Sequence, residues 1–310
     1  MVWNEEVCRE FWWFIAERHE IFRRRIIMRQ PFPWTDDPIL QSVAFTNIYR
    51  ELDRATRVLI RSWPAYASRE DMMFNILKFR FFTLPATYEA LGGFQAAVSW
   101  KPELAETTLL ERWRADQPVF TNAFMYTGSG APGPGGKIKA VIRRLTDIRR
   151  QLSDYTRAVF EAASMPPAHR YLDRIPGFGW FMSYEVLIDV TYTGMVDYGR
   201  DEWVYAGPGA VKGLQVLLAD WTHYSVGLAS ALILALRDWQ SQGFVSAGVK
   251  LNGPRLTLEN IEQALCEFAK YKRALADGWS KRKYDAARAN TDYSLWDDIP
   301  LEFLRKESGV

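Results

Sequence analysis

Arg174-Ile175-Pro176-Gly177-Phe178-Gly179 is the most informative part of the sequence, and the apolar run 180–190 follows it directly. Two glycines beside a proline predict a tight turn, because glycine adopts backbone conformations that other residues avoid. A helix that begins at such a turn presents several unpaired N–H groups in its first turn. Because these groups bind anions, we expect a helix–turn–helix unit with a phosphate site over about 168–191.

A second turn of the same kind, Gly207-Pro208-Gly209-Ala210, also leads into an expected helix. Lys212, just inside that helix, would add a positive charge at its start. We therefore predict phosphate contacts at Gly207, Pro208, Gly209 and Lys212. Two glycine-rich helix starts in one chain indicate a protein that handles phosphates, and those of nucleic acid are the obvious ones.

The composition limits the classes of protein to which the chain can belong. Its 310 residues, 48% of them hydrophobic, can bury a large core. A net charge of +2 provides no global attraction for a polyanion, so nucleic-acid contacts must come from local patches. Two cysteines and three scattered histidines predict neither a disulfide framework nor a metal site. We expect a cytoplasmic protein without a secretory signal or a membrane span.

Helical spacing of apolar residues runs through almost the whole chain, so the sequence predicts an all-α fold. No linker is long enough to require two domains, and we expect a single helical domain over residues 1–310. The most apolar run, 226–236, is too short to cross a bilayer and predicts a buried helix. A small extended piece is expected near 249–258. Residues from about 277 to 310 are charged and aromatic, and we expect them to wrap the surface.

Two long helices are expected from their start and stop signals. Asp37 and Pro38 form a strong helix start, and the helix is expected to continue to about Trp63. The second is expected over 137–163, after the glycine-rich loop 127–136.

The first of these helices would carry a polar stripe. Asn47, Arg50, Glu51 and Arg54 would share one face at spacings of three and four. A solvated face with an internal Glu51–Arg54 pair is the simpler interpretation. However, asparagine is a poor helix former, and its amide both donates and accepts hydrogen bonds. Asn47, Arg50 and Arg54 are therefore also candidates for reading a base and its phosphate.

The second helix would carry the strongest basic patch of the chain. It sets one aspartate, Asp147, against six cations: Lys137, Lys139, Arg143, Arg144, Arg149 and Arg150. Such a helix could clamp a phosphate backbone, although a solvated basic helix explains the charges equally well. The residues predicted to contact DNA are Lys137, Lys139, Arg143, Arg174, Pro176, Gly177 and Gly179.

Carboxylates between the two glycine turns are the candidates for acid–base chemistry. Asp201, Asp197 and Glu185, in that order, could take a proton beside a phosphate site, while helix capping would also account for each of them. A P-loop requires Gly, four residues, and then Gly-Lys-Ser/Thr, and the chain has none. In the glycine-rich loop, Ala131 stands where the first glycine is required, and Ile138 follows Gly136-Lys137. The chain also lacks the Gly-x-Ser-x-Gly elbow of serine hydrolases.

The segment 171–179 resembles the helix-hairpin-helix of the DNA glycosylase superfamily, in which the hairpin grips a DNA backbone. That resemblance implies a glycosylase-like helical fold. The lysine usual after the second hairpin glycine is absent, and Trp180-Phe181-Met182 stands in its place. Asp197 and Asp201 lie where that superfamily's catalytic aspartate would be expected.

A wider resemblance covers most of the chain. It rests on 17–19 (Glu-Arg-His), 33–40, 45–54, 207–214 and the Cys266-Glu267 and Lys270-Tyr271 pairs. These motifs resemble phage-type DNA base hypermodification proteins. That group includes the helical domain associated with 5-hydroxymethyldeoxyuridine (5-hmdU) DNA kinases and the amino acid:DNA transferases, among them the alpha-glutamyl/putrescinyl thymine pyrophosphorylases.

The resemblance implies an enzyme that acts on modified thymine in DNA, with the base flipped out of the helix. The missing P-loop favours a transferase that joins an amino acid or amine to the 5-methylene of a phosphorylated or pyrophosphorylated 5-hydroxymethyluracil. The alternatives are a kinase component that needs a P-loop partner, a non-catalytic module that binds modified DNA, and a DNA glycosylase. Other hypermodification enzymes are expected partners. No cofactor is predicted; a divalent metal is compatible with this chemistry but has no sequence signature.

Overall fold

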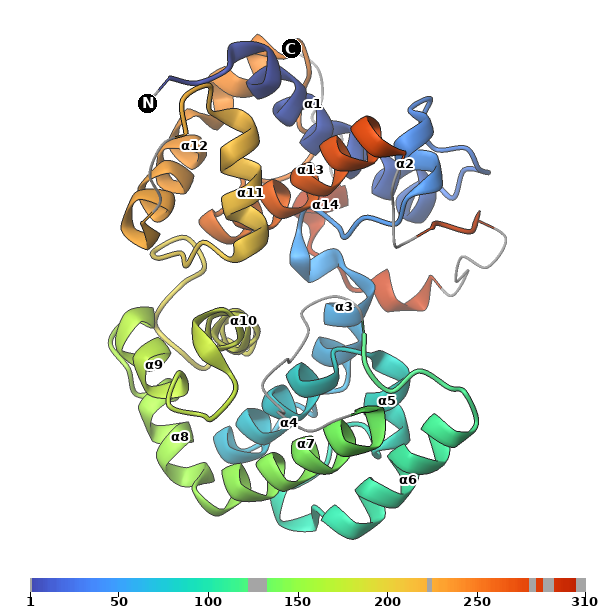
Figure 1. The fold of residues 1–310 in the computed structure, drawn as a ribbon, viewed down its shortest axis with the longest axis vertical. Helices are drawn as coiled ribbons and strands as arrows, with labels where there is room; N and C mark the ends of the chain where they lie inside the picture. The colour runs from blue at the N-terminus through green and yellow to red at the C-terminus, as the bar shows by residue number, and fades with distance from the viewer. Residues whose placement is uncertain (1, 122–132, 222–224, 279–282, 287–292, 305–310) are drawn as a thin grey trace. The chain divides into compact units, whose positions relative to one another are not determined.

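The computed structural model describes residues 2–121, 133–221, 225–278, 283–286 and 293–304, and it is built from helices (Figure 1). Within these residues the only β-type pairings are two isolated bridges, Trp3–Leu218 and Val43–Lys283. The prediction of an all-α fold is confirmed.

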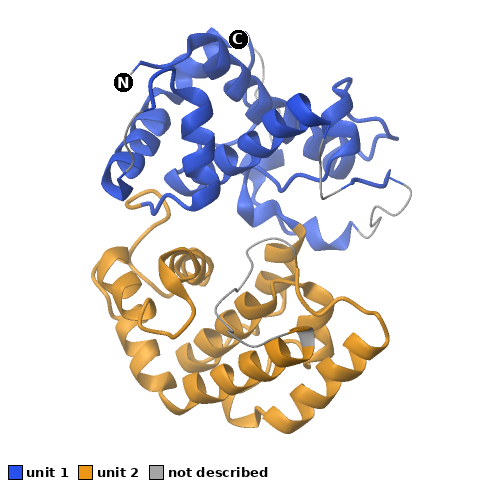
Figure 2. Ribbon diagram, viewed as in Figure 1, with its two compact units in different colours: residues 1–53, 204–310 blue, residues 54–203 orange. Residues whose placement is uncertain are grey.

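The chain forms two compact units (Figure 2). Unit 1 combines Met1–Asp53 with Val204–Val310, and unit 2 comprises Arg54–Trp203. Two units inside one chain can still be lobes of one domain, so the single-domain assignment stays a prediction.

Unit 1 is built around helices from both ends of the chain. Its elements are α1 (Glu5–Phe22), η1 (Arg23–Ile27), α2 (Pro38–Ser42), η2 (Arg50–Leu52), α11 (Pro208–Leu217), α12 (Val226–Ser246), α13 (Leu258–Asp277), η5 (Ser294–Trp296) and α14 (Leu301–Leu304). Aromatic side chains of α1 fill the core: Phe11 lies edge-on to Phe268 of α13 at 5.3 Å, and Trp12 to Phe244 of α12 at 5.0 Å. Both α1 rings are fully buried.

The prediction of one helix from Pro38 to about Trp63 is wrong. The helix that begins at Pro38 ends at Ser42, and the segment 43–49 that follows is not helical. Side chains of α1 and α13 bind the backbone of this segment in place of helical hydrogen bonds. Arg18 donates to two of its carbonyls (3.2 and 3.1 Å) and Lys270 to a third (2.8 Å), while Glu267 accepts from one of its N–H groups (2.9 Å). Tertiary partners thus override the local helix signal.

Unit 2 contains α3 (Arg54–Arg61), α4 (Arg69–Phe82), α5 (Pro85–Ala90), η3 (Ala97–Ser99), α6 (Pro102–Arg114), α7 (Gly133–Arg150), α8 (Leu152–Phe160), α9 (Met165–Leu172) and α10 (Gly179–Thr191). Every residue from Met72 to Phe82 of α4 is buried. A helix buried on all sides is the core of its unit, and α4 contacts α7, α8 and α10.

The second long helix is interrupted. Gln151, at φ −115° and ψ 16°, separates α7 from α8, so the continuous helix expected over 137–163 is wrong. Within the expected glycine loop, 133–136 form the first turn of α7, and 127–132 lie outside the described residues. The extended piece expected at 249–258 is irregular, and α13 begins at Leu258.

The described part of the C-terminal region packs against the N-terminal part of unit 1. The Trp296 indole donates to the Leu52 carbonyl at 2.8 Å, and the rings of Phe303 and Tyr49 lie 4.9 Å apart. These contacts place the C-terminal region against the end of the segment 43–53.

Candidate functional site

The turn between α9 and α10 has the backbone conformation that its sequence predicts. Gly177 lies at φ 86° and Gly179 at φ 64°, in the region that other residues rarely adopt. A Cβ at Gly179 would meet nothing within 4 Å, so backbone conformation alone requires the glycine. Arg174, Pro176, Gly177 and Gly179 are all exposed, and no side chain caps the start of α10. The start of α10 is therefore open to solvent.

The residues around this turn anchor it to the core of unit 2. Phe178 is buried, and its ring lies 5.0 Å from that of Phe81 in α4. His169 Nε2 lies 2.7 Å from the Trp180 carbonyl, which can only accept, so this nitrogen carries the proton. Burial lowers the pKa of His169, which keeps the imidazole neutral. The start of α10 is thus held by one buried ring and one partly buried hydrogen bond.

A buried ion-pair cluster fixes the rest of α10. Arg80 of α4 donates to both carboxylate oxygens of Asp189 and, at 3.2 Å, to Glu185. All three side chains are 2% exposed or less. Glu185, one of the predicted catalytic carboxylates, is therefore paired inside the protein. Its catalytic role stays a prediction, and the pairing favours a structural one.

An open groove of about 360 Å³ brings the turn together with the helix α7. Its charged lining residues are three arginines and one aspartate, and we call it the basic groove. It is lined by Arg144, Asp147, Ile148, Arg150, Gln151, Tyr155, Arg174 and Pro176. Asp147 lies 3.9 Å from Arg144 and 3.3 Å from Arg150, which leaves an excess of positive charge beside Arg174.

Of the predicted DNA contacts, Arg174 and Pro176 line the basic groove, whereas the three on α7 lie elsewhere. The Lys137 ammonium lies over the Phe120 ring at 4.2 Å, and burial lowers its pKa. Lys139 is 4.0 Å from Glu106 of α6. Arg143 lines a second depression that also contains Lys139 and Glu106. Their role in DNA binding stays a prediction.

Arg144 and Arg150 belong to the predicted basic patch but were not among the predicted DNA contacts, and Tyr155 was not predicted at all. The usable signal for Arg144 was its spacing of four from Ile148, which also lines the groove. Tyr155 lies on α8, beyond the break at Gln151, while 139 and 143 line the depression beside α6.

The predicted polar stripe is divided between the two units. Asn47 and Arg50 are buried in unit 1, and Arg54 is exposed at the first residue of α3 in unit 2. The Asn47 carbonyl accepts from the Gln263 side chain, and its Oδ1 has no hydrogen-bond partner among the described residues. The three residues do not share a helix face, so that part of the prediction is wrong. Their contact with substrate stays a prediction.

His19 of α1 is a buried polar residue of unit 1 for which no role was predicted from the sequence. Its Nε2 lies 2.8 Å from the Asn252 carbonyl and so carries the proton, and its ring is 4.9 Å from that of Tyr49. Burial lowers the pKa of His19 to about 4. Nδ1 is left as a buried acceptor with no partner among the described residues. The Glu-Arg-His motif was the signal that could have identified it.

The second glycine turn is explained by close packing of α11 on α13. A Cβ at Gly209 would lie 2.2 Å from Cys266 Sγ, and one at Gly213 would lie 2.3 Å from the Leu265 carbonyl oxygen. The Gly207 N–H donates to Glu262 at 3.0 Å in a buried contact. A carboxylate already occupies this helix start, which disfavours a phosphate there. The roles of Gly207, Gly209, exposed Pro208 and exposed Lys212 in phosphate binding stay predictions.

The remaining predicted carboxylates lie in the loop after α10. Asp197 is exposed and Asp201 is half-buried, both within unit 2. No group of three histidine, cysteine, aspartate or glutamate side chains that could hold a metal occurs among the described residues. None of the described helices is long and apolar enough to cross a membrane.

Comparison with known proteins connects the chain to a family. The sequence matches the family described as "5-hmdU DNA kinase, helical domain" over residues 5–280. The "5-hmdU DNA kinase" of Bacillus phage SP10 is 27% identical over 293 residues, with 88% of this chain and 46% of the relative covered. The chain thus spans about half the length of the curated relative it matches.

No solved structure matches the chain, so the glycosylase-like fold and the helix-hairpin-helix assignment stay predictions. The resemblance to phage DNA hypermodification proteins is confirmed. Because the family match extends over residues 5–280, the chain belongs to the 5-hmdU DNA kinase helical-domain family.

Proposed function

We propose that the chain binds DNA containing a modified thymine and takes part in the enzymatic modification of that base. The basic groove is the observation that carries this proposal, because it places three arginines beside the exposed start of α10. A chain with a net charge of +2 must obtain its DNA affinity from such a local patch. The name of the phage relative, 5-hmdU DNA kinase, suggests the base, 5-hydroxymethyluracil.

In this proposal the turn and α7 both contact the same DNA strand. The start of α10 binds a phosphate through backbone N–H groups and the positive end of the helix dipole. Arg174 and Arg144 neutralise the same phosphate or its neighbours, because both line the basic groove. These contacts do not distinguish one sequence from another, so recognition of the base requires other residues.

The phage relative favours phosphorylation as the reaction. The 5-hydroxymethyl oxygen would attack the γ-phosphorus of ATP, ADP would leave, and the hydroxyl proton would pass to a base such as Asp201 or Asp197. Because this sequence has no P-loop, ATP would be bound by a separate P-loop protein or segment. We expect this activity in the cytoplasm of a phage-infected cell.

Amine transfer is the second candidate, and the missing P-loop is the feature that favours it. The nitrogen of an amino acid or amine would attack the 5-methylene carbon, the carbon–oxygen bond to the phosphate would break, and the nitrogen would lose a proton. Asp201 and Asp197 would again be the candidate bases. No redox cofactor is required by either reaction.

Nucleoside masses separate these reactions. The protein is incubated with DNA bearing 5-hydroxymethyluracil or its phosphate ester, with ATP, with a candidate P-loop kinase, and with pools of amino acids and amines. A phosphorylated nucleoside that requires ATP supports the kinase role, and an amine adduct that requires the phosphate ester supports the transferase. An abasic site would indicate a glycosylase. Unchanged nucleosides in every mixture would contradict both proposed reactions.

DNA binding is tested separately by fluorescence anisotropy on the same duplexes. We expect the Arg144→Ala/Arg174→Ala double variant to lose affinity by about tenfold or more and to show a shallower salt dependence, since each lost phosphate contact reduces the slope by about 0.9. Arg157→Ala is the matched control, because this exposed arginine of α8 lies outside the groove. Equal affinities for the double variant and the control would refute the role of the groove.

A further inference from the structure

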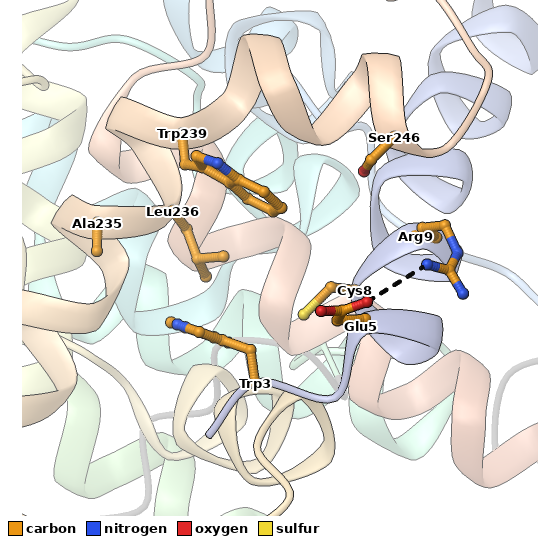
Figure 3. A pocket seen from close by; sticks show the side chains of 8 residues that line it. All are labelled: Trp3, Glu5, Cys8, Arg9, Ala235, Leu236, Trp239 and Ser246. Carbon is orange, nitrogen blue, oxygen red and sulfur yellow. Dashed lines mark ion pairs between the residues drawn. The ribbon is translucent and has the colours of Figure 1, made fainter. Parts of the chain in front are cut away.

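A cavity of about 630 Å³ lies in unit 1 between the N-terminal segment, α1 and α12 (Figure 3). This volume is typical of sites that bind small organic molecules. The cavity is lined by Trp3, Glu5, Cys8, Arg9, Ala235, Leu236, Trp239 and Ser246. None of these residues belongs to the basic groove of unit 2, so the following inference does not depend on the function proposed above.

Trp3 is held in place by its backbone. It forms an antiparallel bridge with Leu218. The N–H groups of Ala219 and Asn4 donate to the carbonyls of Val2 and Leu217, both at 2.9 Å. These contacts fix the backbone of the short segment before α1 on both sides of the tryptophan.

The opposite wall and the floor come from α12 and α1. Trp239 is 45% exposed, while Leu236, one helical turn earlier, is 2% exposed. Figure 3 shows the two indoles on opposite sides of the cavity with Leu236 between them. Cys8 completes the floor at 4% exposure, and burial raises the pKa of its thiol to about 11. The thiol is thus neutral and contributes an apolar surface.

The other end of the cavity is polar and nearly balanced in charge. Glu5 and Arg9 lie there 4.0 Å apart, and the Ser246 hydroxyl faces the same end (Figure 3). An acid and a base in contact favour no net charge on the ligand. Together with the hydroxyl, which donates to the Gly243 carbonyl at 2.8 Å and can still accept, they offer both donors and acceptors for hydrogen bonds.

We propose that this cavity is a nucleoside-binding site, in which a planar base lies against the indoles of Trp3 and Trp239 and the sugar hydroxyls reach Glu5, Arg9 and Ser246. A flat heteroaromatic ring is the group that two tryptophan walls recognise best, through stacking and burial of apolar surface. The same base chemistry is offered by a free nucleoside and by an unpaired base in a DNA strand. The cavity volume accommodates either one.

The test measures binding by isothermal titration calorimetry with two probes. Thymidine represents the free nucleoside, and a short single-stranded oligothymidine represents the base in a strand. The variants are Trp239→Ala, Trp239→Phe and Ala235→Tyr, the last of which fills the cavity from an exposed position without removing a core side chain. Trp113→Ala, at a 42% exposed tryptophan of α6, is the matched control.

Removal of one stacking indole is expected to weaken binding by about 5- to 150-fold. Trp239→Ala and Ala235→Tyr should both lose binding, while Trp239→Phe and Trp113→Ala should keep most of it. If thymidine binds and the variants weaken its binding in this way, the cavity is a free-nucleoside site. If these effects occur only with the oligonucleotide, the cavity takes an unpaired base within a strand. The proposal is overturned if neither probe saturates the protein, or if both bind the Ala235→Tyr variant as well as the unaltered chain. DNA affinity of the basic-groove variants is read separately, so the two proposals can fail independently.

Discussion

Replacement of Arg80 tests how unit 2 holds the helix that starts at the exposed turn. Arg80→Met would remove a guanidinium that donates to both oxygens of Asp189 and to Glu185. The two carboxylates are 0% and 2% exposed, so they would remain in the interior without the Arg80 counter-charge. Loss of one partner from a buried ion pair typically costs about 3–5 kcal/mol of the free energy of unfolding. We expect a loss in that range for Arg80→Met.

The contacts also predict an order among single variants. Asp189 receives two of the three hydrogen bonds and Glu185 one, so Asp189→Asn should destabilise unit 2 more than Glu185→Gln. The triple variant Arg80→Met/Glu185→Met/Asp189→Leu removes all three charges of this cluster. Apolar replacements of buried ion pairs are often neutral, so we expect this variant to recover most of the lost stability.

Hydrogen exchange read by mass spectrometry is the assay, because it reports each unit in the same sample. Peptides from α4 and α10 should exchange faster in Arg80→Met, and peptides from α13 in unit 1 serve as the internal control. A loss of unfolding free energy below about 1 kcal/mol is typical of weak surface pairs and would contradict the role of this cluster as a buried ion pair that stabilises unit 2. So would a larger effect of Glu185→Gln than of Asp189→Asn.

Three further predictions concern other buried groups. Burial lowers the pKa of Lys78 from 10.5 to about 7, and the unfolded chain holds this proton to higher pH. Stability should therefore rise by up to about 5 kcal/mol from pH 7 to 10.5 in denaturation titrations, and Lys78→Met should remove the rise. The lowered pKa of His19 acts in the same direction at lower pH. Stability should fall by up to about 3 kcal/mol as pH drops from 6.5 to 4, and His19→Gln should flatten this part of the curve. Gly213→Ala should cost about 1–3 kcal/mol because its Cβ would meet the Leu265 backbone, whereas Gly227→Ala, in open space on α12, should be neutral or stabilising in the same thermal melts.

The sequence predicted the helical class and the position of the exposed turn because both depend on local chemistry. Apolar spacing predicts helices, and the two glycines at 177 and 179 predict a turn that only their backbone freedom allows. It failed at 43–49, where the decisive partners, Arg18 and Glu267, are far away along the chain. A helix signal from neighbours cannot report a side chain that arrives from another helix.

The candidate site shows the same division. Arg174 and Pro176 were predictable from the turn itself, whereas Arg144 and Arg150 line the groove only because α7 packs beside it. Glu185 was proposed as a base because of its position between two glycine turns. Its actual partner, Arg80, comes from a different helix, and a buried carboxylate has the same sequence signature whether it is paired or reactive.

The motifs quoted for the family resemblance lie almost wholly in unit 1, whereas the residues that line the basic groove lie in unit 2. Arg18, Glu267 and Lys270, all from recognised motifs, bind the backbone of 43–49 in unit 1, whereas the groove belongs to unit 2. These motif residues bind backbone groups and thereby stabilise the fold of unit 1. They support family membership but do not indicate where a reaction would take place. The groove, in turn, supports DNA binding on charge and geometry alone. The family assignment rests on the sequence match over residues 5–280, which includes the groove, and not on DNA binding. Loss of DNA binding in the groove variants would therefore leave the family assignment intact, and the two conclusions can be tested separately.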